Sequence, residues 1–241
     1  MVSRWIPLES NPDWASKAGL VTSQDQFCDV YGFDAELLAM VPQPVKAVVL
    51  LFPISKPYEE KRKAEDERIA KEGQHPIDNT ILWIRQTIQN ACGTMGLLHA
   101  LANSNVTLEP ESPLAQFIDE CKDKTPQERA KLLETTPLFA NIHSEAASAG
   151  QTAVPDISAD VDLHFTCFVE APSPPAREDQ IEAEGEGRRL VELDGRRGGP
   201  VDRGVCTDLL VDAAAYIRDH FVKDATSMSF SMLALAPPAE F

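Results

Sequence analysis

The stretch RQTIQNACGTMGLLHALAN, from Arg85 to Asn103, decides how this chain is interpreted. Its second half, from Met95 to Ala102, places leucines at helical spacing, whereas the residues before Cys92 show no such period. Cys92 therefore sits where a tight connection passes into a helix, and Gly93 leaves room beside the sulfur. The backbone N–H groups at a helix N-terminus favour an anion and lower the pKa of a thiol placed there. The pattern predicts that Cys92 is a nucleophile.

A thiol hydrolase also needs a base, a group that orients the base, and donors for the oxyanion. Gln86, in the connection before the helix, offers a side-chain amide for the oxyanion. His164 lies in an alternating apolar segment that is typical of a strand, which would hold it rigidly as the base. Asp194 ends the short apolar run 190–193 (LVEL). If the two segments pair as a hairpin, Asp194 falls beside His164, and Cys92, His164 and Asp194 form a candidate triad.

Each of these residues also has an ordinary structural interpretation. A Cys before Gly is commonly a packed thiol, a His in a strand is commonly a core residue, and Asp before Gly commonly makes a turn. His99 follows Cys92 by two turns of the same helix, so the two side chains would not meet at one reacting atom. The other competitors for the base are His75, His143 and His220. Spacing alone therefore leaves the cysteine hydrolase as one hypothesis beside a packed thiol.

Helices and strands are mixed along the chain without regular βαβ alternation. We expect strands at residues 45–52, 80–85, 161–169, 190–193 and 229–235. We expect helices at residues 95–102, 113–122, 126–133 and 211–222, and a solvated helix or loop at residues 57–72. We expect a long exposed loop at residues 141–160 and a flexible surface excursion at residues 171–189. This order predicts an α+β fold with a largely antiparallel sheet, in a single domain over residues 1–241.

Composition narrows the class of protein. The net charge is −16, which makes nucleic acid a poor partner and would attract a basic one, although acidity also simply keeps a protein soluble. The five cysteines contain no CxxC pair, and His164 with Cys167 forms an isolated HxxC that lacks further metal ligands. No apolar run approaches ~20 residues and no signal peptide is visible. We expect reduced thiols, a cytoplasmic or nuclear location, and no metal or organic cofactor.

The sequence resembles the UCH-type ubiquitin C-terminal hydrolases, the thiol deubiquitinases of peptidase family C12. The resemblance covers roughly Trp5 to Leu235, in separated blocks that keep their order. The matching stretches are PLESNP (Pro7–Pro12), DVYGFDAELLAMVPQPVKAVVLLFPI (Asp29–Ile54), RQTIQNACGTMGLLHALAN (Arg85–Asn103), HSEAASAGQT (His143–Thr152), VDLHF (Val161–Phe165) and ELDGR (Glu192–Arg196).

The resemblance implies that Cys92 is the nucleophile, His164 the general base and then acid, Asp194 its orienting group, and Gln86 an oxyanion donor. It implies hydrolysis after the C-terminal glycine of ubiquitin through a thioester, with small or unfolded leaving groups favoured. It also implies an α/β/α sandwich, with the sheet between helical lobes, a papain-like cysteine-protease core and a knotted backbone. The segment that matches the family's active-site crossover loop is residues 143–160.

The resemblance also suggests how the substrate is held. Ubiquitin ends in a basic tail, Leu-Arg-Leu-Arg-Gly-Gly, whose arginines acidic residues would pair with. Asp29 matches a position that contacts the tail, and Leu8 and Ser10 match a segment that lines the docking surface. We expect a monomer that acts on ubiquitin, with NEDD8 as an alternative substrate and a non-catalytic ubiquitin-binding module as an alternative function. Lys46 and the long excursion at 171–189 depart from the family pattern.

Overall fold

The centre of the molecule is a sheet in which all neighbouring strands run antiparallel. The structure is a computed structural model that describes Trp5 and residues 13–148, 162–174, 187–223, 225, 227 and 229–239. Within those residues the sheet has six strands in the spatial order β1-β6-β2-β3-β4-β5. The strands are β1 (Gln26–Asp29), β2 (Ala47–Pro53), β3 (Leu163–Pro172), β4 (Arg188–Leu193), β5 (Val201–Val205) and β6 (Ser231–Ala236). The predicted antiparallel character of the sheet is confirmed.

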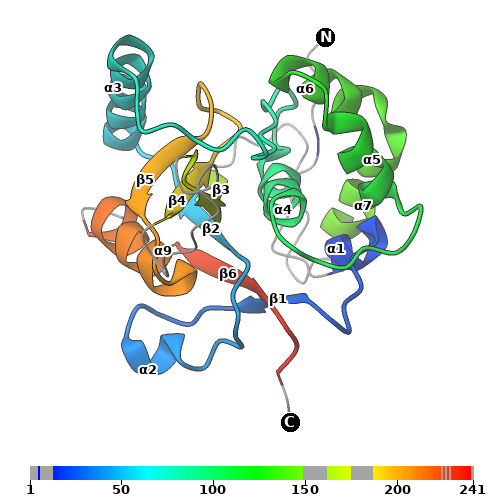
Figure 1. Ribbon diagram of the computed structural model, residues 1–241, viewed down its shortest axis with the longest axis horizontal. Coiled ribbons are helices and arrows are strands. Elements are labelled where there is room, and N and C mark those ends of the chain that lie inside the picture. Colours follow the sequence, from blue (N-terminus) through cyan, green and yellow to red (C-terminus); the bar gives the residue numbers. More distant parts are fainter. Residues whose placement is uncertain are drawn as a thin grey trace.

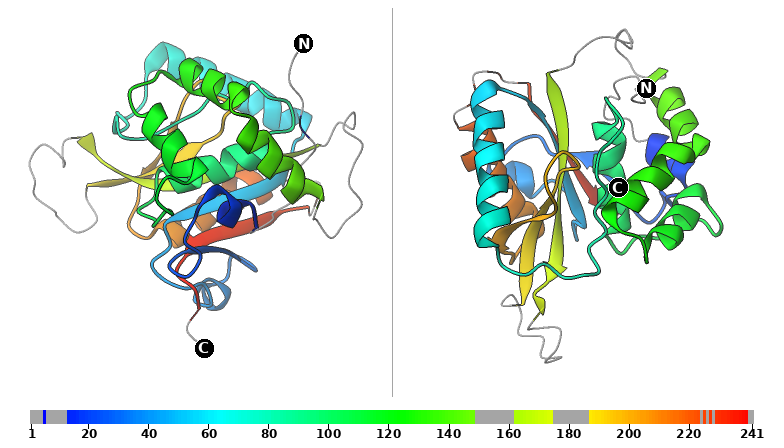
Figure 2. Two further views of the ribbon diagram at one scale, coloured as in Figure 1. Left: turned by 90° about the vertical axis from the view of Figure 1, so that its right-hand side faces the viewer. Right: turned by 90° about the horizontal axis from the view of Figure 1, so that it is seen from above.

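Helices cover both faces of the sheet (Figures 1 and 2). On one face lie α1 (Asp13–Ala18), α4 (Cys92–Ala102), α5 (Pro113–Cys121), α6 (Pro126–Thr135) and α7 (Pro137–Ser148). On the other face lie α3 (Lys56–Glu72) and α9 (Leu209–Ile217), which continues into the π-helical turn η1 (Arg218–Val222). The short α2 (Ala35–Leu38) lies beyond the β1 end of the sheet. The predicted α/β/α layering is confirmed, and among the described residues no helix has the length and apolarity that a membrane span needs.

Two apolar cores lie on opposite faces of the sheet, and β2 divides them. Val49 packs toward the larger core with Trp14 and Leu98, while its neighbour Leu50 packs toward the smaller core with Ile217. Side chains alternate along a strand, so a strand buried on both faces must be apolar at every position. The continuous apolar run predicted as a buried strand at 45–52 is confirmed as β2.

The predicted helix starts at residues 113 and 126 are confirmed. Ser112 caps α5 by accepting a hydrogen bond from the Ala115 N–H at 3.3 Å, and Pro113 follows in the first turn. Thr125 and Glu128 form a reciprocal capping box at the start of α6. These side chains satisfy backbone donors that have no partner within the helix, so they fix where each helix begins.

The strand predicted at residues 80–85 is wrong, because this segment forms no strand within the described part of the chain. Polar side chains satisfy its backbone instead. The Leu82 N–H donates to the Asn103 side chain at 2.6 Å, and the Asn103 amide donates back to the Leu82 carbonyl at 2.8 Å. The Ile84 N–H donates to His99 Nε2 at 3.0 Å. Both acceptors come from the α4 region, so the segment is held against that helix rather than in the sheet.

The exposed loop predicted at residues 141–160 is wrong in its first part, because α7 continues through Ser148. Pro137 opens this helix, and Phe139, Ile142 and Ala146 are buried along one side of it. That spacing is helical, but it is hidden among Ser, Ala and Asn residues that weaken the pattern. Residues 149–161 of the predicted crossover loop lie outside the described residues.

The hairpin predicted to join residues 161–169 to 190–193 is confirmed. β3 and β4 pair from Cys167 opposite Leu193 to Pro172 opposite Arg188. Both strands therefore extend into the segment that was predicted as an excursion, and residues 175–186 of it lie outside the described residues. The single-domain organisation and the knot stay predictions. Strands β1 and β5 were not predicted, since each is short and only partly buried.

Lys46 has a structural explanation here. Its ammonium group lies 2.7 Å from a carboxylate oxygen of the buried Asp25 and donates to the Asn105 carbonyl at 2.7 Å. Asp25 is only 1% exposed, and a buried carboxylate without a partner would be costly. Lys46 thus joins the segment before β1 to the loop after α4.

Candidate active site

Cys92 is the first residue of α4, as the sequence predicted. The preceding Asn90 has a φ of 63°, in the left-handed region that asparagine tolerates better than most residues. This turn delivers the chain into the helix so that the half-buried thiol lies at the helix N-terminus, beside Gly93. The backbone N–H groups of Phe165 and Gly93 also lower the pKa of the thiol. Its position therefore favours the ionised form.

His164 and Asp194 lie on the neighbouring strand β3 and just beyond the end of β4. Nε2 of His164 is 2.8 Å from Oδ1 of Asp194, and both side chains are buried. The His164 ring also faces the Cys92 thiol, closely enough to lower the pKa of that thiol. Because Nε2 faces the carboxylate, Nδ1 is the ring nitrogen left for the sulfur. The three predicted residues are thus brought together in one chain of contacts, although they come from three separate parts of the sequence.

The charges at this site support an ion pair between sulfur and imidazole. Burial raises the pKa of the Cys92 thiol, but the hydrogen bond and charge of His164 outweigh it, and the pKa lies below its ordinary value. Burial lowers the pKa of His164, but the charge and hydrogen bond of Asp194, and then Cys92, raise it well above its ordinary value. Burial raises the pKa of Asp194, yet His164 and the Arg196 N–H hold it below its ordinary range. A thiolate beside an imidazolium is the reactive form of a catalytic cysteine.

Cys92 differs from the other four cysteines, all of which lie within the described residues. Burial raises the pKa of Cys28, the pKa of Cys121 to about 11 and the pKa of Cys206 to about 12, and it raises the pKa of the fully buried Cys167 further. Only Cys92 has a lowered pKa. A packed thiol, the ordinary alternative for Cys92, would show the opposite direction.

Gln86 lies close to the turn that carries Asp194. Its backbone N–H donates to the Gly195 carbonyl at 2.8 Å, and a Cβ atom on Gly195 would come within 2.9 Å of the Gln86 Cβ. Glycine at 195 therefore permits the two segments to touch. The Gln86 amide donates one of its two N–H groups to the Ile88 carbonyl at 3.1 Å, which leaves the other N–H to serve an oxyanion.

Two positioning residues were not predicted from the sequence. His99 is buried, accepts from the Ile84 N–H through Nε2, and contacts the Leu193 carbonyl through Nδ1 at 3.2 Å. Trp83 donates its indole N–H to the Asp194 carbonyl at 3.0 Å. Burial lowers the pKa of His99 to about 4, so the ring is neutral. The sequence showed His99 as a histidine among the apolar residues of α4, and from that pattern we considered it only as an alternative base.

The remaining histidines make other contacts. His143 is hydrogen-bonded to Thr94 at 2.8 Å, His75 approaches Ser173 Oγ at 3.4 Å, and His220 stacks on Tyr216. The assignment of His164 as the base candidate therefore agrees with the geometry.

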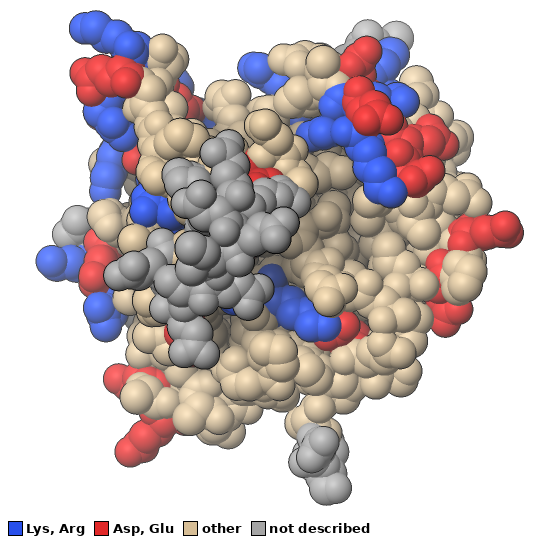
Figure 3. All heavy atoms as spheres, viewed as in Figure 1, with Lys and Arg blue, Asp and Glu red and all other residues tan. Residues whose placement is uncertain are grey.

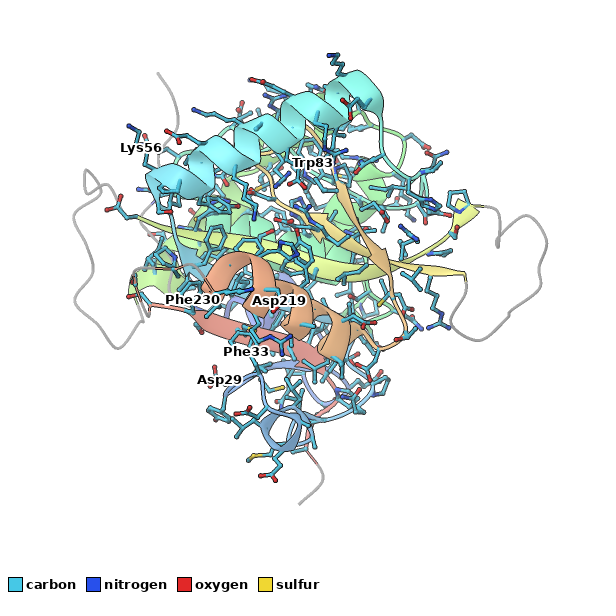
Figure 4. The ribbon with its side chains drawn as sticks, turned by 90° about the vertical axis from the view of Figure 1, so that its left-hand side faces the viewer. Asp29, Phe33, Lys56, Trp83, Asp219 and Phe230 are labelled. Atoms are coloured by element: carbon cyan, nitrogen blue, oxygen red, sulfur yellow. The ribbon has the colours of Figure 1, made fainter. Side chains whose placement is uncertain are left out.

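The predicted substrate contacts are only partly within the described structure. Asp29 is exposed at the end of β1, and Figure 4 shows it with Phe33 at that edge of the molecule, away from α3. Leu8 and Ser10 lie outside the described residues. In Figure 3 both signs of charge gather over α3 and over the α5–α6 region of the viewed face, with much uncharged surface between them.

A cavity of about 490 Å³ lies on the α9 side of the sheet rather than at the sulfur. Its lining includes Phe52, Tyr58, Leu163 and Phe221, and none of Gln86, Cys92, His164 and Asp194. One of its lining residues, Phe52, has its ring 5.7 Å from that of His164. The candidate triad therefore does not depend on this cavity.

Comparison with known proteins fits this geometry. A family model described as "Ubiquitin carboxyl-terminal hydrolase, family 1" matches residues 5–222 of the chain. The chain belongs to this family. Ubiquitin carboxyl-terminal hydrolase 3 of Arabidopsis thaliana is 40% identical over 241 residues, which cover 97% of this chain and 94% of that protein. Ubiquitin carboxyl-terminal hydrolase isozyme L1 of Rattus norvegicus is 35% identical over 240 residues, covering 97% and 98%.

Solved structures support the fold of this family member. The catalytic domain of Trichinella spiralis UCH37, in a crystal structure with ubiquitin vinyl methyl ester, matches with a TM-score of 0.66. The match covers 98% of this chain and 97% of that chain at 19% identity. The expected α+β class is thereby confirmed by an independent structure.

Proposed function

We propose that this chain is a cysteine protease that hydrolyses the bond after the C-terminal glycine of ubiquitin. The observation that carries the proposal is the Cys92–His164–Asp194 chain of contacts, in which the pKa of one thiol out of five is lowered. Membership of the ubiquitin carboxyl-terminal hydrolase family supplies the substrate class.

The residues suggest a two-step reaction. The Cys92 thiolate attacks the carbonyl carbon of the terminal glycine, and the developing oxyanion accepts from the Cys92 N–H and the Gln86 amide. His164 donates its proton to the leaving amine, which departs and leaves a thioester on Cys92. His164 then takes a proton from a water molecule that attacks the thioester, and the free carboxylate and thiol are released. Asp194 keeps the imidazole oriented throughout.

The proposal extends to what surrounds the reacting bond. The family's crossover loop matches residues 143–160, so we assign small or unfolded leaving groups to this enzyme. Asp29, Leu8 and Ser10 are assigned to ubiquitin binding, with the acidic net charge favouring the basic tail. All five cysteines are free thiols, which suits a monomer in the reducing cytosol or nucleus.

The test is an activated-ubiquitin probe together with one substitution. A ubiquitin vinyl-sulfone should add a single adduct to the intact mass, and peptide mapping should place it on Cys92. Cys92→Ala should abolish turnover of a ubiquitin C-terminal reporter while ubiquitin still binds. Cys28→Ala is the matched control, since Cys28 is half-buried like Cys92 but has a raised pKa, and the variant should keep full activity.

Three outcomes would contradict parts of the proposal. An adduct on Cys28 or Cys206 would refute the assigned nucleophile. Zero turnover with retained ubiquitin binding would leave a non-catalytic binding module. Reporter kinetics that favour NEDD8 over ubiquitin would change the substrate but keep the mechanism.

A further inference from the structure

The helix α3 carries charges that do not all face solvent. The sequence predicted residues 57–72 to be solvated because both charge signs are dense there. In the structure, α3 crosses the face of the molecule above the β4–β5 connection (Figure 4, where Lys56 marks its first residue). Glu65 and Asp66 of this helix form ion pairs with Arg197, whose side chain is only 3% exposed. The charged pattern of α3 therefore includes a buried contact face.

Arg197 joins α3 to the turn that begins at Asp194. Its guanidinium donates to Glu65 at 2.5 Å and to Asp66 at 2.8 Å, and its backbone N–H donates to the Asp194 carbonyl at 3.1 Å. The next contact along the helix is Arg62, which donates to the Arg196 carbonyl at 3.3 Å. The turn is thus tied to α3 through side chains and backbone at two successive residues.

The same turn holds the carboxylate of Asp194. The Arg196 N–H donates to Asp194 Oδ1 at 2.8 Å, and this oxygen is also the partner of His164 Nε2. A change in the path of the chain at residues 195–197 would therefore move the atom that orients the imidazole. Trp83 and His99 hold Asp194 and the preceding Leu193 carbonyl from the α4 side, whereas α3 holds the turn from the opposite side.

A second arginine completes the contact face. Arg203 of β5 pairs with Glu65 at 2.6 Å and with the fully buried Glu192 of β4 at 2.5 Å. Burial raises the pKa of Glu65, but Arg203 and Arg197 outweigh it and hold that pKa at about 2. Glu65 is therefore charged at neutral pH and bridges two buried guanidinium groups. Removing one partner of such a cluster is costly because the remaining charge stays buried.

We propose that α3 acts as a brace, meaning that its ion pairs and hydrogen bonds hold the turn of residues 194–197 in place. In this brace, Arg197 is the positioning residue that fixes Asp194 against His164. The brace deepens the proposed function, since it acts on the same Cys92–His164 pair. The titratable and charged groups that face this turn come from every element around it. They are Tyr58, Glu59, Arg62, Glu65 and Asp66 of α3, His99 of α4, His164 of β3, Glu192 of β4, Arg196 and Arg197 of the turn, Arg203 of β5 and Tyr216 of α9.

The brace predicts a specific change in the pH profile. If Asp194 moves away from His164, the imidazolium loses its counter-charge and its pKa falls. The weakened imidazolium then stabilises the thiolate less, so the pKa of Cys92 rises. The bell of kcat/KM against pH should narrow from both sides. Loss of a nearby cation without movement would instead raise the pKa values of both groups, and the bell would shift as a whole toward alkaline pH.

The experiment compares Arg197→Met, which keeps the aliphatic stem, with Arg197→Lys, which keeps the charge. With a ubiquitin C-terminal reporter, Arg197→Met should lower kcat by about 10-fold to 10²-fold, as expected for a small misplacement, with KM within about twofold. In its kcat/KM profile, the acid limb should move up and the alkaline limb should move down, each by about half a pH unit or more. Arg197→Lys should recover most of the lost kcat. Arg218→Met removes an exposed ion pair with Asp219 on η1 and should match wild type.

Two further measurements make the result decisive. If Arg197→Met does not fold, Glu65→Gln serves in its place, because it leaves Arg197 paired with Asp66 and should lower kcat several-fold with the same narrowing. Alkylation of Cys92 by iodoacetamide needs no ubiquitin, so a raised thiol pKa in the variant supports the brace even if ubiquitin is not the substrate. Unchanged pH limbs in a folded variant, or a parallel shift of both limbs, would overturn the proposal.

Discussion

His99 makes acid stability a quantitative test of how the site is held. The ring is buried, and burial lowers its pKa from 6.5 to about 4. The neutral ring keeps Nε2 unprotonated, and Nε2 accepts a hydrogen bond from the Ile84 N–H. The unfolded chain binds this proton more readily than the folded chain between those two values. The stability that His99 contributes is therefore complete above pH 6.5 and is lost as the pH falls. One pKa unit corresponds to ~1.36 kcal/mol, so the full loss is about 3 kcal/mol near pH 4.

The assay is urea unfolding followed by tryptophan fluorescence from pH 7 to about pH 5. The comparison variant is His99→Gln, whose amide can accept and donate but does not titrate. Other titrating groups change both proteins alike, so they cancel in the difference. The free energy of unfolding of wild type, relative to the variant, should fall by about 2 kcal/mol over this interval.

A difference that stays constant between these pH values would refute the reasoning, because it would mean that His99 binds a proton equally well in the folded and unfolded chains. A difference that grows as the pH falls would refute it as well, since that result would require an imidazolium that the fold stabilises. Either result would remove His99 as a neutral link between α4, Ile84 and Leu193.

Three further predictions concern the reactive centre. Asp194→Asn should lower kcat on the order of 10²-fold with KM nearly unchanged, because the substitution impairs the proton-transfer steps. Circular dichroism checks that the variant is folded, and an unfolded variant would leave the orienting role of Asp194 unsupported. In wild type, the acid limb of the kcat/KM profile should lie below the ordinary thiol pKa of about 8.5, because the pKa of Cys92 is lowered. The alkaline limb should lie above the ordinary imidazole pKa of about 6.5, because the pKa of His164 is raised. An alkaline limb near 6.5 would contradict this prediction. Gly195→Ala should lower the free energy of unfolding by about 1–3 kcal/mol in urea titrations and should also reduce kcat, because the new Cβ would lie 2.9 Å from the Gln86 Cβ. Wild-type stability and activity in this variant would show that the turn can shift to accept the added Cβ without cost.

The sequence was most informative where one local pattern determined one element. The apolar alternation around His164 and the run before Asp194 indicated two strands that could pair as a hairpin, and the pairing of β3 with β4 puts the two side chains 2.8 Å apart. Cys92 was placed at a helix start because periodicity begins just after it. These features depend on neighbours in the chain, which a sequence displays directly.

The sequence was least informative where distant residues decide the structure. The segment 80–85 has the composition of a strand, but His99 and Asn103 take its backbone hydrogen bonds and keep it out of the sheet. The charges of α3 looked solvated because their partners, Arg197 and Arg203, lie more than a hundred residues later. No local period encodes such contacts, since any acidic residue in a helix could face either water or a distant arginine.

The spatial order of the strands has a consequence for how the protein is made. Among the described residues β6 is the last strand along the chain, yet it lies between β1 and β2, and β1 joins the sheet there through β6 alone. Until a ribosome has added β6, β1 has no strand edge to pair with, and the edge of β2 that β6 will cover is open. Domains tend to fold as units, so the emerging chain keeps these unpaired strand edges exposed until β6 has been synthesised.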